Sequence, residues 1–402
     1  MRAPAAAAIA LVAAVAGGLG ALAIGRVGGL LAGETTTYVV TEQSQSGAAR
    51  AAVESVARPA VGSFDPARIY AERSPGVVTV FAFFGDSALA LSEQSQGSGF
   101  VVSRDGVILT SSHVITNAGD ATGGPASVAA AKEVYVEFSD GDRVPAQVIG
   151  WDVFDDVGAI RIDTADHPVT PVPLGDSSRV VVGEPVAAIG SPFGNEDSLS
   201  VGVVSATRSI ASLTSQYDVA DAIQTDAPIN HGNSGGPLFD AHGRVIGINA
   251  QIRSGGRSGG FEGVGFAVPI DAARRSLRQL LATGTVVYAY VGIETDDLTP
   301  SIAREYGYPV LHGALIRTVV AASAAERAGL RAGTTNVRHA GMQVRIGGDA
   351  IVAIGKEPVR EASDVARIVA GELEPGQTVR FEVVRDGKRV GIPVRLDERP
   401  TR

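Results

Sequence analysis

The feature that most constrains the fold of this 402-residue sequence is a series of short apolar or alternating runs. Gly, Asp, Asn and Pro separate the runs, and the chain holds 50 glycines in all. Short runs with turn signals between them are typical of strands, so the pattern predicts a mainly β architecture, either a barrel or a sandwich. The predicted strands lie at 76–84, 97–103, 106–112, 133–138, 143–152, 157–163, 185–191, 199–207 and 244–252.

The composition excludes several classes of function. The formal net charge of −9 argues against a general nucleic-acid binder, so we expect no nucleic-acid partner. The sequence has no cysteine, which excludes disulfides, cysteine-ligated zinc and cysteine nucleophiles. Neither a HExxH zinc motif nor a GxxxxGK[ST] phosphate loop occurs in the sequence. We therefore expect no cofactor, no metal and no ATP-driven mechanism.

The N-terminus carries a targeting signal. Residues 3–25 hold no charged side chain, lie between Arg2 and Arg26, and at helical rise are long enough to span a bilayer. We interpret 1–33 as an uncleaved transmembrane anchor or as a signal peptide with small residues at its cleavage site. A buried Ala-rich core helix fits the terminal position less well. Either targeting reading places the rest of the chain outside the cytoplasm, anchored to the cell membrane or secreted or periplasmic after cleavage.

Two folded domains are expected after a polar linker at 34–63. The first domain covers 64–284, from a short helix capped by Asp65 to an amphipathic helix at 269–284 that stops at Gly284. The second covers 287–397 and is again rich in strands. Within it, 362–372 is predicted as a helix and Asp386-Gly387 as the turn of a closing hairpin.

The sequence INHGNSGGPLFD, at 229–240, places Ser234 among glycines. A serine hydroxyl becomes a nucleophile only with a base, a group that orients the base, and donors for the developing oxyanion. His113 follows one predicted strand directly, and Asp156 precedes another. The order His113, Asp156, Ser234 along the chain is that of the chymotrypsin-like double β-barrel.

Seven motifs between 97 and 269 then resemble, in order, those of the HtrA/DegP family of serine proteases. They are GSGFVVS, GVILTSSHVI, DDVGAIRI, AIGSPFG, VGVVSA, QTDAPINHGNSGGPL and GVGFAVP. The segment 287–397 resembles a PDZ domain. The resemblance implies a chymotrypsin-like double six-stranded β-barrel followed by one PDZ domain, with a hydrophobic helix at the N-terminus. The activity it implies is ATP-independent extracytoplasmic cleavage of unfolded or misfolded proteins through an acyl-enzyme, in protein quality control.

The resemblance also assigns roles to residues. His113 is matched to the general base, Asp156 to the acid that orients it and Ser234 to the nucleophile, while the backbone N–H groups of Gly232, Asn233 and Ser234 are matched to the oxyanion hole.

Two alternatives concern neighbouring residues. Asp155 competes with Asp156 if the register is off by one; otherwise we interpret it as a cap or surface acid, and Asp152 as a turn residue. His231 lies three residues before Ser234, where the family often carries Pro. We interpret it as a loop-shaping residue rather than as the base.

The predicted substrate pocket is small and apolar. Pro228 occupies the position six residues before the nucleophile, where specificity for Lys or Arg needs an acid. The opposite wall is formed by Gly263, Val264 and Gly265, so Val, Ile or Ala is expected before the scissile bond. The stretch 212–222 is matched to an activation loop by resemblance alone.

The second domain predicts a peptide-binding loop at YVGIE. By the resemblance to a PDZ domain, backbone amides at Val291, Gly292 and Ile293 would hold a C-terminal carboxylate, with Tyr290 also among the peptide-binding residues. The peptide would then add as a strand beside Ile293. A packing domain without a ligand is the alternative. The insert at 334–348 is expected to form a hairpin.

The expected partners are unfolded protein substrates, C-terminal peptides and the membrane. By resemblance we also expect a homotrimer, formed through 64–84. The competing function is a non-proteolytic chaperone or a PDZ peptide-binding adaptor whose protease fold is idle.

Overall fold

The computed structural model describes residues 64–85, 94–118, 127–190, 198–211, 218–230, 232–250 and 263–400. The predicted anchor or signal segment at 1–33, the linker at 34–63 and His231 lie outside these ranges. Within the described part of the chain, no helix is long and apolar enough to cross a membrane.

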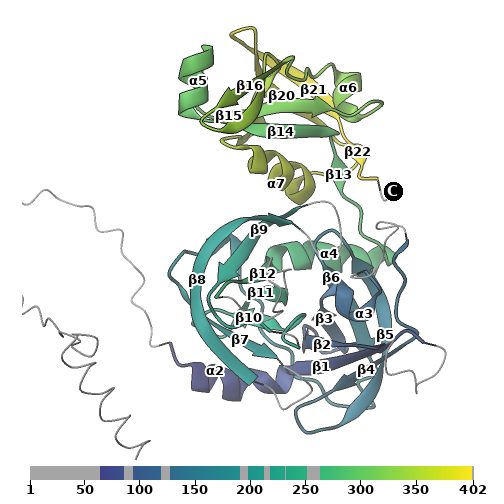
Figure 1. Ribbon diagram of the computed structural model, residues 1–402. Helices are drawn as coiled ribbons and strands as arrows, with labels where there is room; N and C mark the ends of the chain where they lie inside the picture. Colours follow the sequence, from purple (N-terminus) through teal and green to yellow (C-terminus); the bar gives the residue numbers. More distant parts are fainter. Residues whose placement is uncertain are drawn as a thin grey trace, which may run out of the picture. The chain divides into compact units, whose positions relative to one another are not determined.

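The first barrel closes on itself in the strand order β1-β2-β3-β6-β5-β4 (Figure 1). All neighbouring strands in it are antiparallel. Alternate residues point inward, as in β4, where Val134 and Val136 are buried between more exposed neighbours. The strands are β1 (Val77–Phe83), β2 (Gln94–Val101), β3 (Val107–Thr110), β4 (Glu133–Glu137), β5 (Arg143–Asp152) and β6 (Val157–Ile162).

The second barrel closes in the order β10-β11-β12-β9-β8-β7, also with antiparallel neighbours. The expected double six-stranded barrel is therefore confirmed. The sequence pattern missed β9, β10 and β12, because β10 is very short and polar residues interrupt the apolar run of β9. The strands are β7 (Pro185–Gly190), β8 (Ser198–Ala211), β9 (Asp218–Thr225), β10 (Pro237–Phe239), β11 (Val245–Ala250) and β12 (Gly265–Pro269). β9 begins at Asp218, so residues 218–222 of the expected activation loop lie in this strand, and the role of 212–222 stays a prediction.

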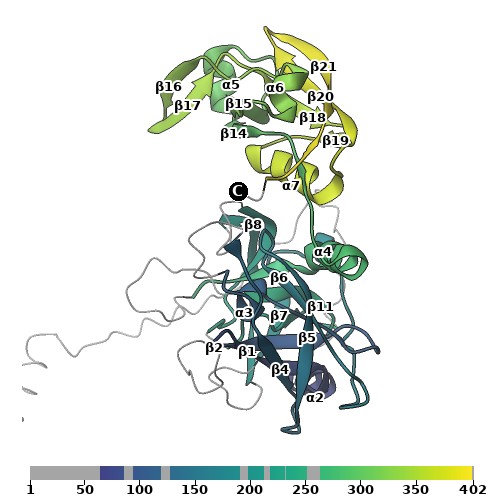
Figure 2. The same cartoon turned by 90° about the vertical axis from the view of Figure 1, so that its right-hand side faces the viewer.

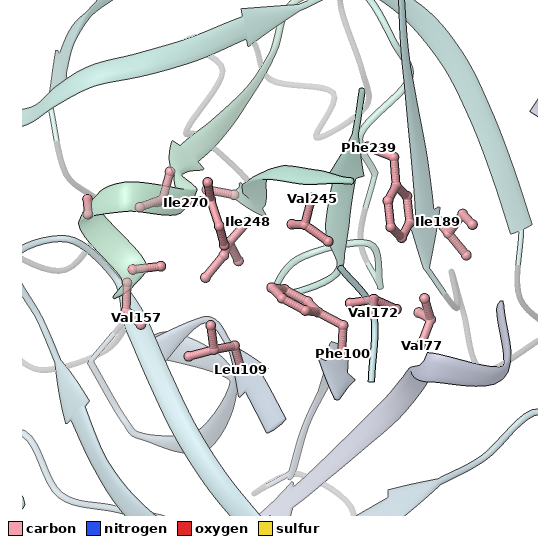
Figure 3. Packing of buried hydrophobic residues seen from close by; sticks show 14 of the residues in the cluster. Val77, Phe100, Leu109, Val157, Val172, Ile189, Phe239, Val245, Ile248 and Ile270 are labelled. Atoms are coloured by element: carbon pink, nitrogen blue, oxygen red, sulfur yellow. The ribbon is translucent and has the colours of Figure 1, made fainter. Parts of the chain in front are cut away.

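The largest hydrophobic core joins the two barrels (Figure 3). Phe100 of the first barrel and Phe239 of the second are both fully buried in this cluster. Truncating a buried Phe to Ala typically costs about 3–5 kcal/mol, so this interface holds the barrels in a fixed relation. Residues labelled in Figure 3 include Val77, Leu109, Val157, Val172, Ile189, Val245, Ile248 and Ile270.

Two helices flank the barrels in the sequence, α2 before the first barrel and α4 after the second. α2 (Pro66–Arg73) begins as predicted, with the Asp65 side chain accepting a hydrogen bond from Arg68 N. α4 (Ile270–Thr283) ends at Gly284, which adopts φ 76° and donates its N–H to Leu280 O. Ile270, Ala273 and Leu280 of α4 belong to the core between the barrels. The short helices are α3 (Ser112–Ile115) and the 3-10 turns η1 (Ser74–Gly76) and η4 (Ser177–Arg179).

The C-terminal unit is built on a sheet in the order β14-β15-β18-β20-β21, with β19 paired to β18 (Figure 2). Asp386 and Gly387 both have positive φ, 51° and 74°, and form the predicted hairpin turn between β20 and β21. The predicted helix at 362–372 is present as α7 (Ala362–Glu372), which packs against β14 and β15. The insert forms the separate hairpin β16–β17, as predicted.

The bounds of the remaining elements are β13 (Ala289–Tyr290), β14 (Ile293–Leu298), β15 (Gly313–Val319), β16 (Thr335–His339), β17 (Met342–Ile346), β18 (Ala350–Ile354), β19 (Glu357–Pro358), β20 (Thr378–Arg385), β21 (Lys388–Arg395), β22 (Asp397–Glu398), α5 (Pro300–Tyr306) and α6 (Ala324–Ala328).

Candidate active site

His113 and Asp156 meet on the first barrel. His113 lies in the single turn α3 directly after β3, and Asp156 lies in the turn between β5 and β6. The His113 Nδ1 atom is 2.7 Å from Asp156 Oδ2. Asp156 Oδ1 also accepts hydrogen bonds from the His113 backbone N–H at 3.1 Å and from Ser112 Oγ at 2.7 Å. Three donors thus fix both oxygens of one carboxylate, which in turn fixes the imidazole.

Asp156 reaches this position through an unusual backbone. Its φ of 54° lies in the left-handed region, which non-glycine residues rarely adopt, although Asp is among the most tolerant of them. The conformation is held by the backbone hydrogen bond from Ser112 N to Asp156 O, 3.2 Å long. The carboxylate is almost fully buried, with 4% of the residue exposed.

The electrostatics of the pair suit a general base. Burial lowers the pKa of His113, but the charge of Asp156 and the hydrogen bond to it outweigh burial and raise the pKa overall. With Nδ1–H directed at the carboxylate, the neutral imidazole keeps Nε2 as its proton acceptor. The acid therefore sets the tautomer that a serine nucleophile requires.

Ser234 lies in a tight turn before β10 of the second barrel. Gly235 has φ 84°, and a Cβ atom at this position would collide with the carbonyl oxygen of Ser98 and the hydroxyl of Thr110. Only glycine therefore lets the loop approach the first barrel this closely. The Ser98 N–H donates to Ser234 O across 2.8 Å, which connects the two barrels at the candidate nucleophile. Ser234 Oγ is buried and makes no hydrogen bond within the described part of the chain.

The segment before Ser234 has the form of an oxyanion hole. Gly232 has φ 98°, a conformation that frees its peptide group to turn toward the nucleophile. Its carbonyl oxygen accepts a hydrogen bond from Ser98 Oγ at 2.6 Å, which fixes the orientation of the peptide that follows. The Asn233 N–H already donates to Asn230 O at 3.0 Å. Of the three expected donors, the Gly232 and Ser234 N–H groups are therefore the better candidates.

The expected pocket residues lie near this loop. The Pro228 carbonyl oxygen accepts hydrogen bonds from Asn233 Nδ2 at 3.4 Å and from Ser200 Oγ at 2.9 Å. A Cβ atom on Gly265 would lie 2.7 Å from Ile229 Cγ1, so Gly265 and Ile229 face each other closely. Gly263 and Val264 are exposed, Val264 to 49%.

The expected peptide-binding loop of the PDZ unit has a suitable conformation. Gly292 has φ 79°, and a Cβ atom there would collide with the Ser323 side chain. The Val291 and Gly292 carbonyls accept hydrogen bonds from Ala325 N and Val320 N, which fix the loop. Ile293 begins β14, which stands at the end of the strand order among the described strands. Tyr290 belongs instead to β13, paired with Asp397 of β22.

Two residues lie in an environment that the sequence did not predict. Asp152, interpreted as a turn residue, and Asp155, interpreted as a cap or surface acid, are both buried, with 2% and 8% of each residue exposed. Asp152 does stabilise the local turn, since its Oδ1 accepts from Phe154 N and Asp155 N. Its other oxygen contacts Ser276 and Tyr288, more than 120 residues away, which no local pattern could indicate.

Sequence reasoning also missed Ser98 and Ser112, whose hydroxyls contact the catalytic segments. Both lie inside motifs that carried the resemblance, GSGF and TSSHVI. Small hydroxyl residues adjoining a glycine or the candidate base were the available signal. Their partners, Gly232 and Asp156, are 134 and 44 residues away in the sequence.

Two closed β-barrels, a partly buried His–Asp pair on one and a serine in a glycine turn on the other, define a chymotrypsin-like serine protease. Family models agree: one for a trypsin-like peptidase domain matches 97–248, and one for a PDZ domain matches 289–396. The structure of the HtrA-type protease AlgW with a tripeptide is similar, with a TM-score of 0.66 and 31% identity over 84% of this chain and 98% of that one. The chain therefore belongs to the HtrA/DegP-type family of serine endopeptidases.

Curated relatives point the same way. A probable periplasmic serine endoprotease DegP-like from Hahella chejuensis is 38% identical over 79% of this chain and 61% of its own length. A protein of the same description from Pseudomonas savastanoi is 38% identical over 76% of this chain and 57% of its own. The chain thus spans about three fifths of the length of these relatives. A serine endoprotease structure from Yersinia pestis is also similar, at 26% identity and a TM-score of 0.57.

Proposed function

We propose that the protein is an ATP-independent serine endopeptidase that cleaves unfolded or misfolded proteins, with His113, Asp156 and Ser234 as its catalytic triad. The observation that carries this proposal is the Asp156 carboxylate, which accepts three hydrogen bonds from Ser112 and His113 and holds the imidazole by its Nδ1. A structural histidine needs no such orientation, whereas a general base does.

In the proposed reaction, Ser234 Oγ attacks the scissile carbonyl carbon while His113 Nε2 takes the hydroxyl proton. The developing oxyanion is stabilised by the N–H groups of Gly232 and Ser234. The C–N bond then breaks as His113 returns the proton to the leaving amine, which leaves an acyl-enzyme. A water molecule repeats the sequence, and Ser234 is regenerated. Asp156 holds the imidazole by its Nδ1 atom and stabilises the imidazolium that forms.

The proposed specificity is for Val, Ile or Ala before the scissile bond. Pro228 carries no charge, and the closely facing Gly265 and Ile229 leave little width for a side chain. An arginine ester that is cleaved faster than the matched valine substrate contradicts this part of the proposal. We further propose that C-terminal peptides bind beside β14, with their carboxylate on the loop of Tyr290, Val291, Gly292 and Ile293.

The proposed location is outside the cytoplasm. The uncharged run at 3–25 supports this, as does the word periplasmic in the names of the curated relatives. Membrane attachment through 1–33, assembly as a homotrimer through 64–84 and the domain boundaries 64–284 and 287–397 are part of the same proposal. Crosslinking of the full chain followed by mass measurement tests the trimer.

The test of the main proposal combines an active-site probe with a substrate. A serine-reactive fluorophosphonate should label the wild-type chain and leave Ser234→Ala unlabelled, and unfolded casein should be cut only by the wild type. His113→Ala should abolish both reactions. If His231→Ala abolishes labelling while His113→Ala does not, the assignment of the base is wrong.

One observation favours the alternative of an idle protease fold: Ser234 Oγ has no hydrogen-bond partner among the described residues. Catalytic hydrogen bonds are often long or misaligned in free enzymes, so this geometry alone does not exclude catalysis. Absence of labelling under every condition, including saturating C-terminal peptides, would favour a chaperone or adaptor.

A further inference from the structure

A buried cluster of polar side chains adjoins Asp156 in the chain and takes no part in the proposed reaction. Asp152 ends β5, and Asp155 lies in the turn that leads to Asp156. Ser276 comes from α4, and Tyr288 follows that helix. Asp152 and Tyr288 each have only 2% of their surface exposed, and Ser276 has none.

The Tyr288 hydroxyl connects the two carboxylates. It hydrogen-bonds Asp152 Oδ2 at short range and Asp155 Oδ2 at 2.7 Å. Asp152 Oδ2 also accepts from Ser276 Oγ at 2.6 Å. The Arg275 guanidinium donates to Asp155 Oδ2 at 2.9 Å and leaves Asp152 without a cation in direct contact among these groups.

The number of protons in the cluster decides how many of these hydrogen bonds can form at the same time. A phenol has one proton and can donate to one carboxylate at a time, so a second hydrogen bond needs a proton on a carboxyl group. Burial, followed by the charge of Asp155, raises the pKa of Asp152 to about 6. A protonated Asp152 donates to the Tyr288 oxygen, and Tyr288 then donates to Asp155, whose charge Arg275 balances.

Tyr288 is itself held in place on every side. Its ring packs edge-on against Phe154, with centroids 5.4 Å apart. The guanidinium of Arg399 lies 4.9 Å from the Tyr288 ring centroid, and Arg399 N donates to Tyr288 O at 2.8 Å. The Tyr288 hydroxyl is therefore held in a fixed position, from which it hydrogen-bonds two residues of the turn 152–156.

This turn carries the strained residue. Asp152 Oδ1 accepts from Phe154 N at 2.9 Å and from Asp155 N at 3.3 Å, and Asp156 follows with its φ of 54°. A left-handed non-glycine residue persists only where its surroundings over-determine it. We propose that Tyr288 and Asp152 are positioning residues that hold the turn 152–156 and thereby align Asp156 with His113. The inference rests on the proposed triad.

A purely structural role explains the cluster less well. Burying two carboxylates and an arginine costs desolvation, and hydrophobic residues of similar volume often give equal or greater stability. A polar cluster does offer directional contacts to the two oxygens of Asp152, which apolar packing lacks. We therefore infer that these residues fix the position of the turn 152–156 rather than raise the stability of the fold.

The test uses Tyr288→Phe in the full chain, because this change removes one hydroxyl and keeps the ring against Phe154. Tyr308→Phe is the matched control, since the Tyr308 hydroxyl is half-buried and accepts from Gly347 N within the PDZ unit. We expect Tyr288→Phe to lower kcat on a peptide substrate by about tenfold or more with KM within about twofold, because small misplacement of catalytic groups is costly. The control should leave kcat unchanged.

A second readout does not depend on catalysis. NMR titration of His113 should show that Tyr288→Phe lowers its pKa toward the ordinary value, because a displaced Asp156 stabilises the imidazolium less. Asp152→Ala should do the same, because it removes the carboxylate that accepts from Phe154 N and Asp155 N. Asp152→Asn, which mimics the protonated carboxyl and keeps an acceptor for the turn, should retain the wild-type titration of His113.

The outcomes separate the inference from the proposed function. If the wild type neither labels nor cleaves, the proposed function fails, and the His113 titration still tests the positioning role. If Tyr288→Phe keeps kcat within twofold of wild type, the inference is wrong. It is equally wrong if the variant only melts at a lower temperature while the folded protein shows the wild-type titration of His113.

Discussion

Replacement of Ser98 by Ala provides a direct test of how the oxyanion hole is held. The Ser98 hydroxyl is fully buried and donates to Gly232 O across 2.6 Å. Its backbone N–H holds Ser234 O, and its carbonyl oxygen accepts from Thr110 Oγ1 at 2.7 Å. Ser98→Ala keeps both backbone contacts and removes the bond to Gly232 O, so it tests the orientation of the Gly232–Asn233 peptide, which lies between the two expected donors, Gly232 N–H and Ser234 N–H.

The magnitude follows from the burial of this contact. A buried acceptor that loses its donor costs about 1–3 kcal/mol. If that cost falls on the arrangement with the hole formed, relative to one in which the Gly232–Asn233 peptide has turned to find another donor, the active fraction drops about 5- to 150-fold. Because the hole binds the oxyanion and not the ground-state carbonyl, we expect kcat and kcat/KM to fall equally.

The assay is steady-state hydrolysis of a chromogenic peptide, normalised by the fraction of folded protein from circular dichroism. Ser111→Ala is the matched control, because Ser111 is also fully buried and its hydroxyl has no hydrogen-bond partner among the described residues. It should retain wild-type kcat. A Ser98→Ala variant within twofold of wild type, or an equal loss in both variants, refutes the reasoning.

Three further predictions follow from the site and the PDZ unit. Asp156→Asn should lower kcat roughly 10,000-fold. Because the Asp156 carboxylate raises the pKa of His113, its removal should also move the acid limb of the kcat/KM profile to lower pH, which a pH series measures. Gly292→Ala forces a side chain into Ser323 at φ 79° and should weaken binding of a labelled C-terminal peptide by about tenfold or more in fluorescence anisotropy; unchanged affinity would place the carboxylate elsewhere. Arg385→Met leaves the fully buried Asp349 without the guanidinium that donates to both of its carboxylate oxygens. The free energy of unfolding, measured in urea, should fall by about 3–5 kcal/mol, and a loss below about 1 kcal/mol would contradict this.

Local signals predicted many elements well. The helix at 362–372 and the hairpin turn at Asp386-Gly387 are present where the sequence placed them. The cap of Asp65 and the stop at Gly284 were also readable, because capping and left-handed glycine are properties of a few adjacent residues. The strand β9 was missed because its pairing depends on the neighbouring strands that it packs against, and its own sequence has no regular alternation of apolar and polar residues.

The sequence by itself determined the mainly β architecture, the chain order of His113, Asp156 and Ser234, and the glycines in the turn around Ser234. These follow from residue type and short spacing, which act over a few positions. Only the tertiary structure decided that Ser98 holds Gly232, that Ser112 contacts Asp156 and that Asp152 is buried against Tyr288. Such contacts join residues dozens to more than a hundred positions apart. Their geometry is set by how the barrels close and pack, which no local pattern records.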